Sequence, residues 1–105
     1  MRPEIKERWV AALRSGDYVQ GKDYLQRDGK YCCLGVLCDL HAQATGNQWK
    51  VMPGHKMAYN DNELYAAQEA LEWAGLTDEQ GRVLATLNDG NAHFHAIAYA
   101  IEKLF

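Results

Sequence analysis

The cysteines and histidines of this 105-residue chain are the side chains best suited to covalent chemistry. Cys32 and Cys33 are adjacent where a predicted strand meets a predicted helix, and amides at a helix N-terminus stabilise a thiolate. His93 or His95 could act as the base, with Asp89 orienting the imidazole. A cysteine-dependent enzyme is therefore one hypothesis. Because the spacing matches no cysteine-nucleophile signature, we favour thiols that pack a core and assign no catalytic residue.

The same residue types are also zinc ligands. Cys33, Cys38, His41 and the pair His93 and His95 supply enough thiolates and imidazoles for a four-coordinate site. However, Cys33 and Cys38 diverge on a helix, and the chain contains no C-x-x-C pair. We therefore expect no bound metal and no other cofactor.

A group of aromatic and methionine side chains follows the most apolar part of the chain. Such residues are enriched in protein-binding surfaces. They could equally seal a core beneath a long loop, because an apolar segment without clear periodicity fits both arrangements. The first candidate binding surface consists of Trp49, Met52, His55, Met57 and Tyr59. The hairpin tip, Arg27 to Lys30, is a candidate extension of it.

A polar turn near the C-terminus is the second candidate. Asn88, Asp89 and Asn91 flank a predicted helix start, where exposed amides can hold a small anion or another small ligand. Such residues are more often only helix caps. A pocket between the central helix and this turn would suit a small molecule or a nucleotide.

These candidates are organised around the apolar run YCCLGVLCDL, residues 31–40. Helical spacing of apolar residues predicts a buried central helix over residues 33–44. Before it, Asp28 and Gly29 predict a two-residue hairpin turn that places Leu25 opposite Cys32 and Tyr24 opposite Cys33. The central helix should end at Gly46.

Other patterns predict the remaining elements. Residues 3–15 form an amphipathic helix, residues 49–52 a third strand or a lid, and residues 55–59 a mobile or functional loop. Capping boxes start one helix at Asn60 with Glu63 and another at Thr77 with Gln80. Asn91 or Asp89 caps the last helix. The sequence therefore predicts one α+β domain over residues 1–105, mostly helical, with about five helices and a small antiparallel β-hairpin sheet.

Composition narrows the classes of function. The net charge of −3 leaves no basic excess for a phosphate backbone, so we expect no nucleic-acid partner. No apolar run approaches the roughly 18 residues of a membrane span, and the N-terminus lacks a signal-peptide core, so we expect a cytoplasmic protein without membrane contact. An odd number of cysteines, two of them adjacent, favours free thiols in a reducing compartment.

Four stretches carry a resemblance to a known family: RWVAALRSGDYVQG, YCCLGVLCDL, LEWAGL and LATLNDGNAHFHAIAYAIE. They resemble a functionally uncharacterised family of small proteins from phages, prophages and bacterial genomes, and the likeness covers most of the chain. One departure is Ala92-His93, where the family often has a serine-like cap before the phenylalanine. The resemblance implies a genomic context and transfers no catalytic residue.

Small acidic phage-type proteins without a catalytic signature commonly act by binding. The leading hypothesis is therefore a small accessory protein that binds, and inhibits, a host protein of defence or metabolism. A module that binds or sequesters a small molecule or nucleotide is the main alternative, and a cysteine-dependent enzyme is the third. An exposed aromatic loop would also permit a homodimer.

Overall fold

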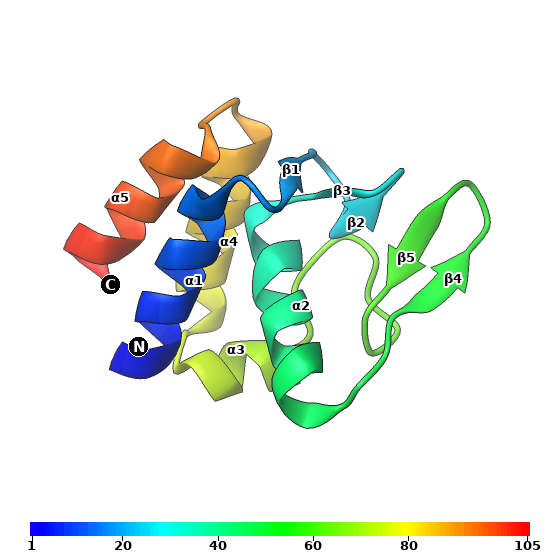
Figure 1. Ribbon diagram of the computed structural model, residues 1–105, viewed down its shortest axis with the longest axis horizontal. Coiled ribbons are helices and arrows are strands. Elements are labelled where there is room, and N and C mark those ends of the chain that lie inside the picture. The colour runs from blue at the N-terminus through cyan, green and yellow to red at the C-terminus, as the bar shows by residue number, and fades with distance from the viewer.

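Helices occupy one side of the molecule and a small sheet the other, with α2 between them (Figure 1). The computed structural model describes all residues from 1 to 105. Both termini lie on the helical side, away from the sheet (Figure 1). The elements are α1 (Pro3–Ser15), β1 (Val19–Gln20), β2 (Gln26–Arg27), β3 (Lys30–Tyr31), α2 (Cys33–Thr45), β4 (Lys50–Met52), β5 (Lys56–Ala58), α3 (Gln68–Ala74), α4 (Asp78–Asp89) and α5 (Phe94–Leu104). The predicted α+β class with five helices is confirmed.

The predicted central helix is confirmed as α2, and its boundaries have local causes. Cys32 is the N-cap, and its Sγ accepts a hydrogen bond from the amide of Gly35 at 3.3 Å. Gly46 ends the helix in the left-handed conformation, with φ of 81°. A Cβ at Gly35 would collide with the carbonyl of Leu25, so only glycine lets α2 approach the first hairpin this closely. From α1, Trp9 donates its indole N–H to the carbonyl of Cys33 at 3.0 Å.

The hairpin predicted at Asp28 and Gly29 is also confirmed. Both residues have positive φ, 54° and 76°, as a two-residue type I′ turn requires. The amide of Cys32 donates to the carbonyl of Leu25 at 3.2 Å, so these two residues pair as expected. The expected pairing of Tyr24 with Cys33 is wrong, because Cys33 is already the first residue of α2.

The sheet is larger than expected and is mixed, with strand order β1-β3-β2-β5-β4. β1 pairs with β3 in parallel. Residues 55–59 were expected to be a loop, but Lys56–Ala58 form β5, which pairs with both β2 and β4. Pairing with β2 and β4 makes this segment a strand. The sequence did not indicate this pairing, because the segment is short and its apolar and polar residues do not clearly alternate.

The third helix begins later than predicted. Asn60 and Asp61 have φ of 48° and 67°, and such left-handed residues cannot open an α-helix. The Asn60 amide instead donates to Glu69 at 2.8 Å, and α3 starts at Gln68. Thr77 and Gln80 form the predicted capping box of α4.

The start of α5 also differs from the prediction. The N-cap residue is His93, whose side chain makes no capping hydrogen bond. Asp89 is the last residue of α4, and Asn91 lies in the connecting turn with φ of 76°. The longest helices have 13 residues, and none combines the length and the apolar character needed to cross a membrane.

Candidate binding surface

The structure divides the residues of the predicted aromatic loop between core and surface. Tyr59 is fully buried, and its hydroxyl lies 2.6 Å from Nδ1 of His41. Burial lowers the pKa of His41, so the imidazole is neutral at pH 7 and forms an uncharged pair with Tyr59. Trp49 is half-buried and packs against Tyr59, with ring centroids 5.1 Å apart. Only Trp49 of these two can therefore contact a partner.

The other three predicted residues lie on the second hairpin, β4 and β5. His55 is exposed in the turn, with φ of 61°. Met57 is half-buried and pairs with Val51, which is 76% exposed, so the two share one face of the sheet. Met52 pairs with Lys56 and belongs to the opposite face. The five predicted residues therefore do not form one continuous surface.

A different aromatic surface forms where α2 meets the strands. We call it the Asp39 surface, and it consists of Tyr18, Tyr31, Asp39, Gln43 and Trp49. Tyr31 lies between the other two rings, with its centroid 5.0 Å from Tyr18 and 6.1 Å from Trp49, both edge-to-face. All three rings are half-buried. They come from the α1–β1 loop, from β3 and from the segment before β4, so only the tertiary structure brings them together.

Asp39 is the polar centre of this surface. Its Oδ2 accepts hydrogen bonds from the Tyr18 hydroxyl at 2.6 Å and from the Gln43 amide at 3.1 Å. Its Oδ1 accepts the indole N–H of Trp49 at 3.0 Å. All three donors are uncharged, and Asp39 takes part in none of the four ion pairs of the molecule. The half-buried carboxylate thus has no cation of the chain paired with it.

The tyrosines of this surface remain protonated. Burial raises the pKa of Tyr18 far above its usual value, and the hydrogen bond to the Asp39 carboxylate raises it further. Burial and the charge of Asp39 raise the pKa of Tyr31 in the same direction. The two hydroxyls therefore stay neutral, and the charge of the surface is that of Asp39.

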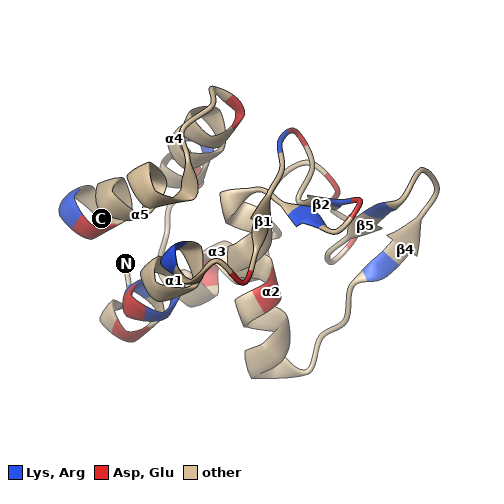
Figure 2. Cartoon of the chain, turned by 45° about the horizontal axis from the view of Figure 1, so that its top comes forward, with Lys and Arg blue, Asp and Glu red and all other residues tan.

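A groove of about 540 Å³ adjoins this surface between the end of α1 and α2. Tyr18 and Gln43 belong to both the groove and the Asp39 surface, and Asp17 supplies the only charge in its lining. No lysine or arginine lines it. Figure 2 shows acidic positions on α2 and on the loop that follows α1. The remaining lining residues are Ala11, Ala12, Ser15 and Leu40.

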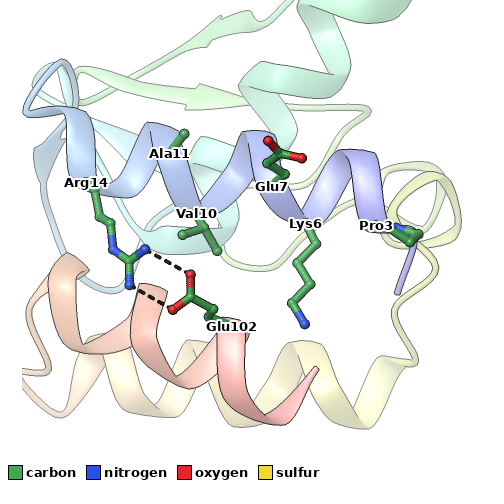
Figure 3. Close-up of a pocket in the computed structure, with 7 residues that line it drawn as sticks. All are labelled: Pro3, Lys6, Glu7, Val10, Ala11, Arg14 and Glu102. Atoms are coloured by element: carbon green, nitrogen blue, oxygen red, sulfur yellow. Dashed lines mark hydrogen bonds and ion pairs between the residues drawn. The ribbon is translucent and has the colours of Figure 1, made fainter.

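A second groove, of about 500 Å³, lies between α1 and α5 (Figure 3). Arg14 of α1 reaches across to Glu102 of α5, and the pair is 3.1 Å apart. Lys6 and Glu7 supply one further charge of each sign. The charges of this groove therefore balance within the chain, unlike those around Asp39.

The predicted turn at residues 88–91 contributes mainly to the hydrogen bonding of the protein interior. The Asn88 side chain is fully buried, and its Oδ1 accepts from the Cys33 amide at 3.1 Å and from Gln20 at 3.0 Å. Its Nδ2 donates to the carbonyl of Gly21 at 2.8 Å. Both polar atoms of this side chain bond groups inside the protein, and the side chain is fully buried, so Asn88 does not face a ligand.

Asp89 and Asn91 differ from Asn88 in exposure. Asp89 accepts a hydrogen bond from the backbone amide of Asp23 at 3.0 Å, which ties α4 to the chain before β2. Asn91 is exposed and lines a third groove, of about 390 Å³, with Gln20, Lys22, Ala92 and His93. No cysteine lines any of the three grooves. The structure thus shows no cavity between α2 and this turn for a small molecule.

The three thiols are buried. Burial raises the pKa of Cys32 to about 11 and that of Cys38 to about 12, and raises that of Cys33 well above its usual range. Cys33 Sγ contacts the carbonyl of Leu84 at 3.5 Å. A catalytic cysteine needs an accessible thiolate, and this environment keeps the thiols protonated instead. The structure also brings no three His, Cys, Asp or Glu side chains together in an arrangement that could hold a metal ion.

Four of the five residues of the Asp39 surface, all except Trp49, were not among the predicted site residues. One signal was available, because Asp39 is the only Asp, Glu, Lys or Arg residue of α2, a helix whose residues are mostly buried. Gln43 follows it one helical turn later, on the same side. Tyr18 and Tyr31 carried no such signal, since their contacts depend on the path of the chain between α1 and β3.

Comparison with known proteins identifies a family but no function. A family model described as Domain of unknown function (DUF8296) matches residues 1–105. No curated protein and no solved structure gives a significant match. Because the family model spans the chain from its first residue to its last, this chain belongs to the DUF8296 family.

Proposed function

We propose that this chain is a protein-binding module and that the Asp39 surface is its contact surface. The observation that carries the proposal is the row of half-buried rings of Tyr18, Tyr31 and Trp49. Tyrosine and tryptophan are common binding hot spots, because they offer a large contact area at a small cost in conformational entropy. Edge-to-face contacts and the hydrogen bonds to Asp39 hold these rings in place, so little order has to be gained on binding.

The adjoining sheet face extends this surface. By strand register, Tyr31, Gln26, Met57 and Val51 point to the same side of β3, β2, β5 and β4. Apolar and aromatic groups with a few polar atoms are typical of the centre of a protein interface.

The resemblance to phage and prophage proteins supports a host protein as the partner. On this proposal the chain acts by occupying a surface of that protein and inhibiting it. The buried thiols and the solid core beside residues 88–91 favour this function over a cysteine enzyme and over a small-molecule module.

Quantitative affinity capture from a bacterial lysate tests the proposal with matched variants. Trp49→Ala and Tyr31→Ala should each lower the recovery of a captured protein by about tenfold, as loss of a hot spot does. Tyr99→Ala removes an aromatic ring that is 58% exposed on α5, outside the surface, and should leave recovery unchanged. Thermal unfolding of each variant separates lost binding from lost folding.

The proposal fails if all three variants capture the same proteins to the same extent. Native mass spectrometry of the purified chain adds a second check. If the chain is a dimer that Trp49→Ala converts to monomers, the surface binds a second copy, and the host-protein proposal is overturned.

A further inference from the structure

We propose that the Asp39 surface receives an arginine side chain of the partner protein. This inference rests on the proposed protein-binding function and specifies the chemistry of the contact. The observation behind it is that the half-buried carboxylate of Asp39 accepts hydrogen bonds from uncharged donors only. Carboxylates removed from water are usually paired with a cation, and this one is not.

The other tyrosines that are not fully buried already have a cation of the chain beside the ring. Tyr24 lies beneath Arg27 and Lys56, each 5.1 Å from the ring centroid. Tyr65 carries Arg82 at 5.1 Å, and Tyr99 carries Lys103 at 5.7 Å. No lysine or arginine of the chain lies over the rings of Tyr18, Tyr31 or Trp49 in this way. The Asp39 surface therefore combines aromatic rings and a negative charge with no cation from within the chain.

The hydrogen bonding of Asp39 leaves room for a guanidinium. A carboxylate has about four acceptor positions, of which Tyr18, Trp49 and Gln43 use three. The Gln43 side chain is exposed, so its amide can leave for water and free a second position. A guanidinium could then donate two hydrogen bonds to the carboxylate while its plane lies against an aromatic ring. The adjoining groove, with Asp17 in its lining, has the volume for the aliphatic part of the side chain.

The direct test is a titration followed by ¹H–¹⁵N NMR, with the indole N–H of Trp49 as reporter. The probe is the peptide Ac-Gly-Arg-Gly-Arg-Gly-NH₂, and its matched control replaces arginine by citrulline, which has the same shape without the charge. The arginine peptide should shift the Trp49 indole resonance with saturation, and the citrulline peptide should not. Equal shifts with both peptides, or no shift with either, would overturn the inference.

Two further probes identify the cation. If a lysine peptide of the same length binds as tightly as the arginine peptide, the surface recognises positive charge without distinguishing the two side chains. The assignment of arginine is then wrong. If spermidine binds more tightly than either peptide, the ligand is a free polyamine, and the assignment to a protein partner is wrong. We expect the arginine peptide to bind most tightly, since only the guanidinium can pair with the carboxylate in two places.

Variants test the role of the carboxylate. Asp39→Asn removes the charge, and Gln43→Lys places a competing cation one helical turn away without altering Asp39. Each should weaken binding of the arginine peptide by about tenfold, as loss of a charge-assisted hydrogen bond does. Glu79→Gln, an equal charge change on an exposed and unpaired residue of α4, should leave affinity within about twofold of wild type. Unchanged binding in Asp39→Asn and Gln43→Lys would overturn the inference.

The two proposals can fail separately. If Trp49 and Tyr31 are needed for capture but the arginine peptide does not bind, the protein-binding function stands and the arginine inference is wrong. If the peptide binds through Asp39 but no captured protein depends on Trp49, the arginine contact stands and the protein-binding function is wrong.

Discussion

Two polar regions contact α2, the buried network of Asn88 and the Asp39 surface, and they differ in how their polar groups are hydrogen-bonded. At the start of the helix, the buried side chain of Asn88 bonds the amide of Cys33, the carbonyl of Gly21 and the side chain of Gln20. Gln20 in turn bonds the backbone of Ala92 and Phe94. On the outward side of the same helix, Asp39 is bonded only by neutral donors at the edge of solvent.

On the proposed function, this difference separates residues that stabilise the fold from residues that bind a partner. A buried polar network that is fully satisfied within the chain joins elements that are far apart in sequence and leaves nothing to offer a ligand. A half-buried charge without a counter-ion keeps an unmet interaction that another molecule can provide. Substitutions at the first region should therefore change stability, and those at the second should change binding.

The largest loss of stability is expected at the contact between α2 and the first hairpin. In Gly35→Ala, the new methyl group collides with the carbonyl of Leu25, and the hairpin must move away. We expect a loss of about 3 kcal/mol or more in the free energy of unfolding, measured by urea denaturation. The control Gly46→Asn places a tolerated residue at the left-handed end of the helix and should cost about 1 kcal/mol or less. Near-wild-type stability of Gly35→Ala would refute this account of the close approach.

The next largest effect is expected at the buried network. Asn88→Ala leaves the amide of Cys33, the carbonyl of Gly21 and the amide of Gln20 without this partner, so we expect a loss of about 2–3 kcal/mol. Asn91→Gly is the control, because Asn91 is exposed and has a left-handed backbone that glycine adopts easily. Its stability should stay within about 0.5 kcal/mol of wild type. If both variants unfold at the same urea concentration, Asn88 has no special structural role.

Alkaline pH should lower the free energy of unfolding through the buried thiols. The folded-state pKa values of Cys32 and Cys38, about 11 and about 12, lie above the ordinary value of 9.0. The unfolded chain therefore releases these protons first as the pH rises, and stability present below pH 9 is lost progressively between pH 9 and pH 12. Urea denaturation at several pH values measures this slope. Cys32→Ser, which keeps a capping oxygen but does not titrate in this range, should make the slope shallower.

The smallest changes in stability are expected at the Asp39 surface. Asp39→Asn keeps one carbonyl oxygen for Tyr18 or Trp49, so we expect it to cost about 1 kcal/mol. Gln43→Ala removes an exposed donor and should change stability by about 0.5 kcal/mol or less. A loss in Asp39→Asn as large as that in Asn88→Ala would show that Asp39 is part of the structural network, and the contrast between the two regions would disappear.

Patterns close together in the sequence were sufficient for much of the fold. The apolar spacing of residues 33–44, the turn at Asp28 and Gly29 and the capping box of Thr77 with Gln80 all formed as predicted. Each feature depends on interactions between residues a few positions apart, so the local sequence is sufficient to predict it. The start expected at Asn60 failed because the left-handed backbone of Asn60 and Asp61 and the contact with Glu69 overrode the capping pattern.

The sequence by itself determined which segments would be helical, where the first hairpin would turn and that α2 would be the core. Tertiary structure alone decided the parallel pairing of β1 with β3, the place of β5 in the sheet and the burial of Tyr59. It also placed Tyr18, Tyr31 and Trp49 around one carboxylate. Such contacts join residues separated by long stretches of chain, and their energies depend on how all the elements pack, which no local pattern records.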